Sequence, residues 1–255
     1  MISDTHVHTS FSPDSSAPPE DMIKRAAELG MSTVFITDHY DADVTYGDWA
    51  FDPDEYFEIL GPLKEKYRGT IDVKIGIEIG LQPHLVSHFQ KLFSDYPFEY
   101  VIGSIHVLDG KDPYYRDEYD MTDDEYFRMY FQYSAECFEA CKGLYDTVGH
   151  LDYVVRYAYS GTKEYSYEKY AAWIDPILDA AVESGAALEI NTGAIKYGQD
   201  ILHPAEAVVR KYLEKGGRKF TVGSDAHRVR DIGRGFGRAE EYLQSFGVNI
   251  SIPKD

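Results

Sequence analysis

The sequence predicts an α/β fold in which seven strand–helix units form a barrel. Short apolar runs, which suit buried strands, alternate along the chain with longer amphipathic stretches, which suit helices. The chain of 255 residues has a length that α/β barrels commonly use as one domain, and no linker or internal repeat interrupts residues 1–255. An open doubly wound sheet is the alternative, because it shows the same alternation of strands and helices.

The expected strands are short apolar runs, each followed by a stretch with helical character. This order implies a parallel sheet with the helices outside it. The expected strands cover residues 2–7, 33–37, 73–79, 100–105, 146–149, 187–190 and 220–222.

Proline, capping residues and glycine mark the expected helices. Pro18 and Pro53 each stand at the start of a helix. Thr122, followed three positions later by Glu125, resembles a capping box, and Gly185 is a helix stop. Helices are expected over residues 18–30, 53–67, after 83, 122–142, 166–184, 204–214 and 234–245, and the tail after residue 246 forms an edge strand or stays loose.

The composition of the chain indicates which binding partners and which cellular compartment to expect. A formal net charge of -19 without a Lys/Arg cluster argues against nucleic acid, which requires a basic surface. No apolar run approaches the ~18 residues of a membrane helix, and Met1-Ile2-Ser3-Asp4 does not begin a signal peptide. Cys137 and Cys141 stand four apart in an expected helix, where a disulfide fits poorly. We therefore expect a cytoplasmic protein, and the sequence does not give its oligomeric state.

Residues able to do chemistry follow the expected strands. In a parallel α/β fold the active site lies at the carboxyl ends of the strands. A single histidine at such a position is more often a surface or satisfied core residue, but six of the nine histidines fall there, most with a carboxylate close by in sequence. The candidates are His6, His8, Asp14, His39, Glu78, His106, His150, Asp225 and His227.

Nine histidine and carboxylate candidates are too many for one tetrahedral site. They suit two or three divalent ions, with Zn, Fe and Mn all compatible, and Glu78 is the natural bridge because its strand lies among the others. Neighbouring ions of this kind activate water and hold phosphate oxygens in phosphoryl transfer. The expected partner is therefore a small-molecule phosphate ester.

The strand-end segments resemble the motifs of the polymerase and histidinol phosphatase (PHP) family. The resemblance extends in order to about residue 240 and implies a distorted seven-stranded (β/α)7 barrel. The segments are Asp4-Thr5-His6-Val7-His8-Thr9, Thr37-Asp38-His39, Gly76-Ile77-Glu78, Gly103-Ser104-Ile105-His106, Gly149-His150-Leu151-Asp152 and Gly223-Ser224-Asp225-Ala226-His227.

The resemblance also implies how three ions are divided among the candidates. One ion is held by His6, His8, Glu78 and Asp225, a second by Glu78, His106 and His150, and a third by Asp14, His39 and His227, with Asp14 matched only by its place after the first motif. Glu78, Asp225 and His227 then take part in catalysis, an acid near Asp225 or His227 helping the alkoxide to leave.

The segments around His106 and His150 are similar to the stand-alone histidinol-phosphate phosphatase branch of the family. That similarity implies hydrolysis of L-histidinol phosphate in histidine biosynthesis, with Arg156 and Lys196 as candidate phosphate-binding residues. A solvated loop arginine is an equally good interpretation of Arg156.

Two departures from the branch pattern keep the substrate open. Branch members often have an aromatic residue where this chain has His203, and Ser-Gly where it has Gly193-Ala194. His84 and His88 stand four residues apart but lack the glutamate of the zinc-protease motif. We interpret them mainly as surface residues, with His84 as a candidate for the pocket rim. The alternatives are a phosphoesterase for another small ester or a nucleotide, and a non-catalytic metal-binding module, which the filled ligand positions disfavour.

Overall fold

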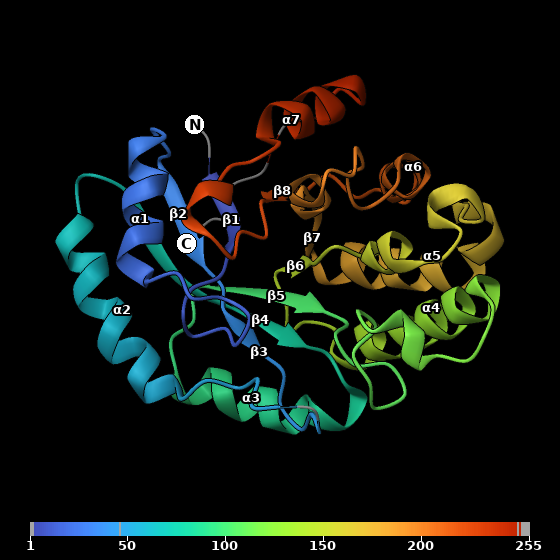
Figure 1. The fold of residues 1–255 in the computed structure, drawn as a ribbon, viewed down its shortest axis with the longest axis horizontal. Coiled ribbons are helices and arrows are strands. Elements are labelled where there is room, and N and C mark those ends of the chain that lie inside the picture. Colours follow the sequence, from blue (N-terminus) through green and yellow to red (C-terminus); the bar gives the residue numbers. More distant parts are fainter. Residues whose placement is uncertain (1–2, 46, 249, 251–255) are drawn as a thin grey trace.

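The fold of the computed structural model is a nearly closed barrel of parallel strands surrounded by helices (Figure 1), described over residues 3–45, 47–248 and 250. The sheet runs in the order β1-β2-β4-β5-β6-β7-β8, and β3 pairs with β4 beyond the end of β2. Every strand pair in it is parallel. The strands are β1 (Ser3–Val7), β2 (Thr33–Ile36), β3 (His39–Tyr40), β4 (Asp72–Gly80), β5 (Tyr100–Ser104), β6 (Thr147–Val148), β7 (Ala187–Asn191) and β8 (Phe220–Gly223).

The barrel closes where β1 meets β8. The Thr5 hydroxyl donates to the carbonyl of Val222 at 3.1 Å, and the His8 amide donates to the carbonyl of Ala226 at 2.9 Å. The register of β1 on β2 shifts between Asp4 and Val7, which distorts the barrel. The predicted (β/α)7 barrel is confirmed, and the open-sheet alternative is wrong because these bonds join the two outer strands.

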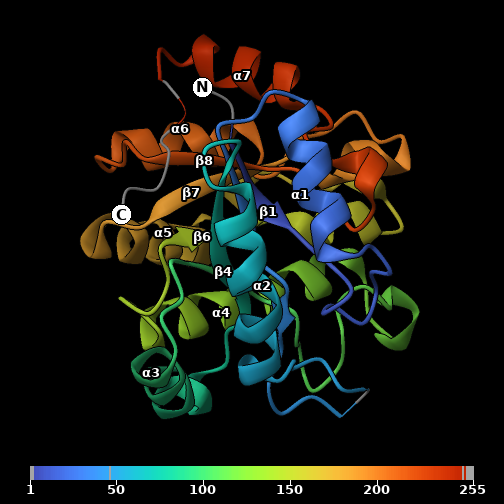
Figure 2. The same ribbon diagram turned by 90° about the vertical axis from the view of Figure 1, so that its left-hand side faces the viewer.

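Seven α-helices lie on the outside of the barrel in the described chain, as Figures 1 and 2 show. The Thr122–Glu125 capping box and the left-handed Gly185 after α5 are both present, as predicted. The helices are α1 (Pro19–Glu28), α2 (Pro53–Tyr67), α3 (Val86–Asp95), α4 (Asp123–Ala140), α5 (Tyr167–Ser184), α6 (Glu206–Glu214) and α7 (Phe236–Ser245), with short 3-10 turns that include η3 (Tyr153–Tyr157) and η6 (Val229–Asp231).

Some predicted boundaries were wrong for local reasons. The second strand divides into β2 and β3, since the chain leaves the ladder at Thr37 and Asp38. The last helix begins at Phe236 rather than at residue 234, because Gly235 has a positive φ of 79° that an α-helix cannot continue through. The expected start of the first strand at residue 2, and most of the tail, lie outside the described residues.

The two ends of the barrel interior differ in character. The rings of Phe35 on β2 and Tyr100 on β5 pack inside the barrel with their centroids 4.9 Å apart, although β4 separates the two strands. Polar side chains instead gather toward the carboxyl ends, where His6 and Glu78 have no exposed surface. The strands thus place their polar residues at one end over an apolar floor. Within the described part of the chain, no helix has the length and apolar character needed to cross a membrane.

Cys137 and Cys141 are free thiols buried one turn apart at the end of α4, where Cys141 is the C-cap residue. Burial raises the pKa of Cys137 far above its ordinary value and that of Cys141 to about 11. Because only the thiolate is nucleophilic, we expect neither cysteine to react quickly with an aromatic disulfide reagent at pH 8. Both should react after denaturation, whereas fast modification of the native protein would contradict this prediction.

Candidate metal centre

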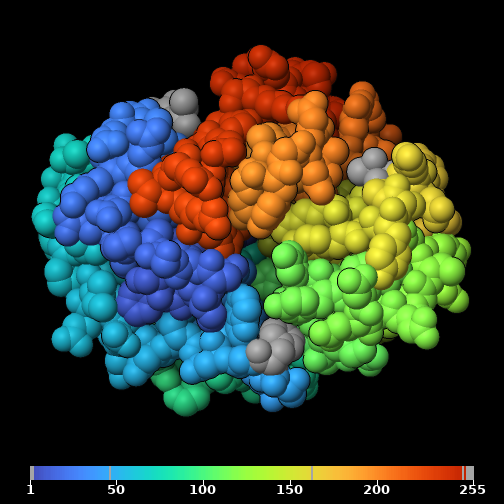
Figure 3. Space-filling model, viewed as in Figure 1, coloured from blue at the N-terminus to red at the C-terminus, as the bar shows by residue number. Residues whose placement is uncertain are grey.

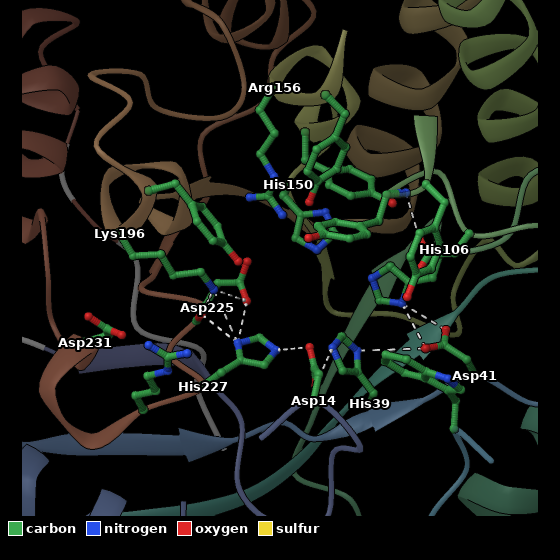
Figure 4. Close-up of a pocket in the computed structure, with 18 of the residues that line it drawn as sticks. Asp14, His39, Asp41, His106, His150, Arg156, Lys196, Asp225, His227 and Asp231 are labelled. Atoms are coloured by element: carbon green, nitrogen blue, oxygen red, sulfur yellow. Dashed lines mark hydrogen bonds and ion pairs between the residues drawn. The ribbon is translucent and has the colours of Figure 1, made fainter. Parts of the chain in front are cut away.

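A pocket of about 690 Å³ opens at the carboxyl ends of the barrel strands. The space-filling view in Figure 3 shows this face, hollowed near its centre where segments from distant parts of the chain meet. Figure 4 shows the polar side chains that line the pocket. Eight of the eleven predicted site residues line its wall: Asp14, His39, His106, His150, Arg156, Lys196, Asp225 and His227.

Glu78, from β4, lies beneath the pocket with no exposed surface, and the predicted histidines surround its carboxylate. Its Oε2 atom lies 3.3 Å from His6 Nε2, 3.5 Å from His8 Nε2 and 2.9 Å from His39 Nδ1. His6 and His8 can converge because residues two apart on a strand share one face.

The other oxygen of Glu78 faces a second group. Oε1 lies 3.4 Å from His106 Nε2 and 2.9 Å from His150 Nε2, and it accepts a hydrogen bond from the Ser104 hydroxyl at 2.7 Å. The two oxygens of one carboxylate therefore serve two different sets of histidines. This division is the geometry required of a bridging carboxylate.

The third group gathers around Asp14 and His227. Asp14 Oδ2 lies 2.9 Å from His227 Nε2, and Asp14 Oδ1 lies 3.8 Å from His39 Nε2. Asp225 Oδ1 lies 3.3 Å from His227 Nδ1 and 3.7 Å from His8 Nε2. Asp14, the candidate placed only by its position in the sequence, thus lies beside both of the histidines predicted to share its ion.

The unsatisfied atoms of the cluster show that its residues fit metal ions. A buried polar atom without a partner is costly, so natural proteins rarely retain one without a ligand or water. Four sets of three side chains have ligand atoms within 4.8 Å of one another, all drawn from this cluster and Asp41. In the described part of the chain, the buried atoms that form no hydrogen bond of acceptable geometry, although a carboxylate lies close to several of them, include His6 Nε2, His8 Nε2, His39 Nδ1, Glu78 Oε2, His150 Nδ1 and His227 Nε2.

Electrostatics prepare the central carboxylate for a cation. Burial alone would raise the pKa of Glu78, but His6, His106 and His39 outweigh burial and hold that pKa well below its usual range. Burial, together with His227 and His39, holds the pKa of His8 well below its ordinary value. An ionised carboxylate and a neutral imidazole are the forms that bind metal.

Two buried carboxylates at the site, Asp41 and Glu189, were missed by sequence reasoning. Asp41 follows β3, and its oxygens lie 2.9 and 3.1 Å from His106 Nδ1. Glu189 of β7 lies 2.7 Å from His6 Nδ1 and accepts a hydrogen bond from the His150 amide at 2.7 Å. Asp41, two residues after His39 at a strand end, and a glutamate inside an apolar strand were the available signals.

These two carboxylates set the orientation of the histidines. By occupying Nδ1 of His106 and of His6, they leave Nε2 of each ring directed at Glu78. Carboxylates in such outer positions typically contribute a factor of about 10–100 to metal affinity. We expect Asp41→Asn and Glu189→Gln each to weaken Zn²⁺ or Mn²⁺ binding by about that factor, measured by competition with a chromogenic chelator. Unchanged dissociation constants would contradict this role.

Other carboxylates of the predicted motifs fix loops instead. Asp38 accepts hydrogen bonds from the hydroxyls of Thr9 at 2.8 Å and Ser12 at 2.7 Å. Asp4 accepts from the amides of Ser224 at 3.0 Å and Gly233 at 3.1 Å. These bonds hold the loops after β1 and β8 in place and explain why the motifs contain aspartates that do not face the pocket.

Arg156 and Lys196 both reach the pocket wall near Asp225 (Figure 4). Lys196 Nζ donates to the backbone carbonyl of Asp225 at 2.7 Å. The Arg156 guanidinium lies over the rings of Tyr153 and Tyr157, at 5.2 and 4.8 Å from their centroids. Its Nε and Nη1 are buried and have no hydrogen-bond partner among the described residues, so Arg156 is not a solvated surface arginine.

The remaining histidines lie outside the pocket. His84 is exposed and 2.9 Å from Asp43, away from the pocket rim, and His88 Nε2 lies 3.2 Å from the Tyr40 hydroxyl. His203 is buried, and its Nδ1 lies 2.6 Å from Asp152. The interpretation of His84 and His88 as surface residues agrees with these positions, whereas His203 forms a buried pair that sequence reasoning did not anticipate.

Comparison with known proteins decides the family. A model of the PHP domain matches residues 4–193, and a model described as PHP-associated matches residues 205–247. The chain belongs to the PHP family. In this PHP protein the second match covers α6, β8 and α7, so it supplies the last strand of the same barrel.

Relatives of this PHP protein carry consistent names. It is 34% identical over 94% of its length to a protein of Clostridium acetobutylicum named probable histidinol-phosphatase, and the match spans 91% of that protein. It is 27% identical to the histidinol-phosphatase of Lactococcus lactis subsp. lactis, covering 88% and 83% of the two chains. A crystal structure of the Lactococcus histidinol phosphate phosphatase with zinc, L-histidinol and phosphate superposes with a TM-score of 0.85, at 25% identity and over 97% and 94% of the two chains.

Proposed function

We propose that this protein is a metal-dependent phosphomonoesterase that hydrolyses L-histidinol phosphate to L-histidinol and phosphate. The observation that carries the proposal is one pocket in which a buried histidine–carboxylate cluster, with unsatisfied ligand atoms, faces an arginine whose Nε and Nη1 have no hydrogen-bond partner among the described residues. Its relatives named for histidinol phosphate, one of them in complex with zinc, L-histidinol and phosphate, support this choice of ester.

We assign one ion to each of the three groups of side chains described above, two of which share the carboxylate of Glu78. His6, His8, Glu78 and Asp225 would hold one ion, Glu78, His106 and His150 a second, and Asp14, His39 and His227 a third. Divalent ions bound there would supply hydroxide near neutral pH and offset the negative charge on the phosphate oxygens. The short distances from Glu78 to both sets of histidines support its role as the bridge.

The side chains of the protein then bind and orient the ester. Arg156 lines the pocket and can offer N–H donors to the phosphate, because its Nε and Nη1 have no hydrogen-bond partner among the described residues. Lys196 is held beside Asp225, with its ammonium 3.7 Å from Asp225 Oδ1, and adds a second positive charge. Trp49, Tyr114 and Tyr157 line the same pocket and provide aromatic surface for an imidazole ring.

The leaving alkoxide requires a proton when the bond to phosphorus breaks. Burial alone would raise the pKa of Asp225, but Lys196, His227 and His6 outweigh burial and hold that pKa far below its usual range. Asp225 is therefore ionised and cannot itself donate that proton. We place the donor at His227, whose Nδ1 lies 3.3 Å from Asp225 Oδ1 and is held in place by that carboxylate.

Substrate preference tests the proposal directly. The purified protein, loaded with Mn²⁺ or Zn²⁺, should release phosphate from L-histidinol phosphate well above the rate for p-nitrophenyl phosphate and for nucleoside monophosphates. Equal rates on all esters would reject histidinol phosphate as the substrate and leave the phosphoesterase chemistry standing. The cytoplasmic location and the absence of a nucleic-acid partner stay predictions of the sequence.

Removing the guanidinium of Arg156 tests the phosphate-binding wall. We expect Arg156→Met to lower kcat/KM for L-histidinol phosphate by about 10²-fold, because a charge-assisted pair with the phosphate is lost inside a pocket. Arg156→Lys should recover only part of the loss, since an ammonium cannot form the two-donor fork. Arg230→Met, which removes an exposed cation from the pocket rim, is the matched control. An equal effect of Arg156→Met and Arg230→Met in steady-state kinetics would contradict the assignment.

A further inference from the structure

A second cavity, of about 550 Å³, lies behind the phosphate-binding wall of the main pocket. It is bounded by the start of η3, the chain before and at the start of α6, and one face of α7. None of the residues assigned above to metal or phosphate lines it. Its lining includes the buried pair His203 and Asp152, a feature that the proposed catalytic function does not use.

The inner lining of this cavity offers an unused hydrogen-bonding group. Asp152 lies against Nδ1 of His203 at 2.6 Å and also accepts from the Ala205 amide at 2.8 Å. His203 is 2% exposed, and its other ring nitrogen, Nε2, has no partner among the described residues. The Tyr165 hydroxyl lies in the same lining beside Asp152. Because buried polar atoms are normally satisfied, the free His203 nitrogen indicates a bound ligand with a hydrogen-bond donor.

The charge of the rim selects the sign of that ligand. Three carboxylates, Asp200, Glu206 and Glu241, line the cavity together with one guanidinium, Arg238. Arg238 is already paired with Asp200, and Arg210 with Glu206, so Glu241 sets the sign of the rim charge, which is negative. An anion such as phosphate is disfavoured there, whereas an ammonium or imidazolium group is attracted.

The remaining lining limits the size and character of the ligand. Val155, Ile201, Leu202 and Tyr242 give the cavity apolar walls. The volume lies in the range of small-molecule sites, which typically measure about 300–1,000 Å³ and combine apolar walls with a few polar groups. A small organic cation with N–H donors and a short apolar or aromatic part matches the acceptor in the lining, the negative rim and the apolar walls.

The partition between the two cavities consists of two short segments. In η3, Val155 faces the second cavity, while its neighbour Arg156 lines the main pocket. Between β7 and α6, Lys196 and Tyr197 of a short 3-10 turn line the main pocket, and residues 200–203, which follow it, line the second cavity. A ligand in the second cavity would therefore rest against the segments that carry the proposed phosphate-binding side chains.

We propose that the second cavity binds a small organic cation with N–H donors, of the class to which L-histidinol belongs, and that its occupancy alters turnover through the Arg156 segment. The choice of L-histidinol as the probe rests on the proposed function, but the cavity does not. A molecule of this class that accumulates in the cell would then regulate the enzyme at a site separate from the catalytic pocket.

Binding stoichiometry tests the site. L-Histidinol is titrated by calorimetry into the zinc-loaded protein, into Glu241→Lys, which makes the exposed rim positive, and into Glu240→Lys, a matched change beside it on α7 outside the lining. We expect the wild type and Glu240→Lys to bind one more equivalent than Glu241→Lys. His203→Phe, which removes the Nε2 acceptor but keeps an aromatic ring, should also lose that equivalent. Equal stoichiometry in the wild type and Glu241→Lys would overturn the site.

The difference between variants separates this inference from the proposed function. If the catalytic pocket did not accept L-histidinol, every protein would bind one equivalent fewer, and the difference between wild type and Glu241→Lys would remain. Turnover of saturating p-nitrophenyl phosphate, which removes competition in the main pocket, reports the coupling. We expect L-histidinol to change kcat at least about twofold in the wild type and not in Glu241→Lys. An unchanged kcat in the wild type would overturn the regulatory role.

Discussion

Replacing Glu78 by glutamine should lower kcat for L-histidinol phosphate by at least about 10³-fold. The reason is that one buried carboxylate faces two sets of histidines, with Oε2 2.9 Å from His39 and Oε1 2.9 Å from His150. Glutamine keeps the shape but removes the charge and one of the two acceptor oxygens. The bound ions should fall below the wild-type number when measured by inductively coupled plasma mass spectrometry.

A matched carboxylate distinguishes bridging from general electrostatics. Glu189 has no exposed surface either and contacts His6 at 2.7 Å, but it lies on the far side of that ring from Glu78. Glu189→Gln should therefore weaken metal binding without reaching the loss in Glu78→Gln. Circular dichroism should show that both variants keep the barrel. A Glu78→Gln protein with its full complement of metal and kcat within tenfold of the wild type would exclude the bridging role.

The candidate metal cluster was predictable from the sequence because its residues stand at strand ends. Short patterns mark those ends locally, and the parallel topology brings them together. The alternation in His6-Val7-His8 is visible locally, and parallel topology brings all carboxyl ends to one edge of the barrel. Glu78 was identifiable as the candidate bridge because its strand, β4, lies among the other strands that carry candidate ligands. These features follow from strand periodicity and topology, which short sequence patterns specify well.

The second layer of the site was not predictable in the same way. Glu189 stands inside the apolar strand β7, where an isolated acidic residue does not reveal its partner, His6, 183 residues away. Asp41 and His106 are likewise 65 residues apart. The pair of His203 with Asp152 depends on how the loop before α6 folds back onto the end of β7, where His203 pairs with Asn191. Such contacts are set by loop packing, for which the sequence has no periodic signal.

Replacing Arg116 by methionine should destabilise the protein by about 3–5 kcal/mol, because it leaves a buried carboxylate without its cation. Arg116 is 4% exposed; its Nη2 donates to Asp123 at 3.0 Å, and its Nη1 donates to the Tyr119 carbonyl at 2.8 Å. Its guanidinium also lies 4.6 and 4.5 Å from the ring centroids of Tyr126 and Tyr159. This residue therefore joins the loop after β5, the start of α4 and the chain beyond η3.

The pH dependence of that loss provides an independent check. Burial alone would raise the pKa of Asp123, but hydrogen bonds from Ser160, Arg116 and Tyr159 outweigh burial and lower it. Its stabilising contribution is therefore present above its unfolded pKa, about 3.9, and is lost as the pH falls through the folded value. Urea unfolding should show the largest deficit of Arg116→Met at neutral pH and a smaller one near pH 4, where protonation removes the uncompensated charge.

The control for Arg116 is an exposed ion pair on the same helix. Arg128 Nε donates to Asp124 at 2.9 Å, one turn apart on α4, with 48% of the Arg128 side chain exposed. Because solvent screens such pairs, Arg128→Met should cost less than about 1 kcal/mol and show little dependence on pH. Equal losses in the two variants would mean that the side chains contribute only packing. A loss confined to Arg116 would show that its buried charge holds in place the loop that carries Asp112, Tyr114 and Tyr115 to the pocket wall.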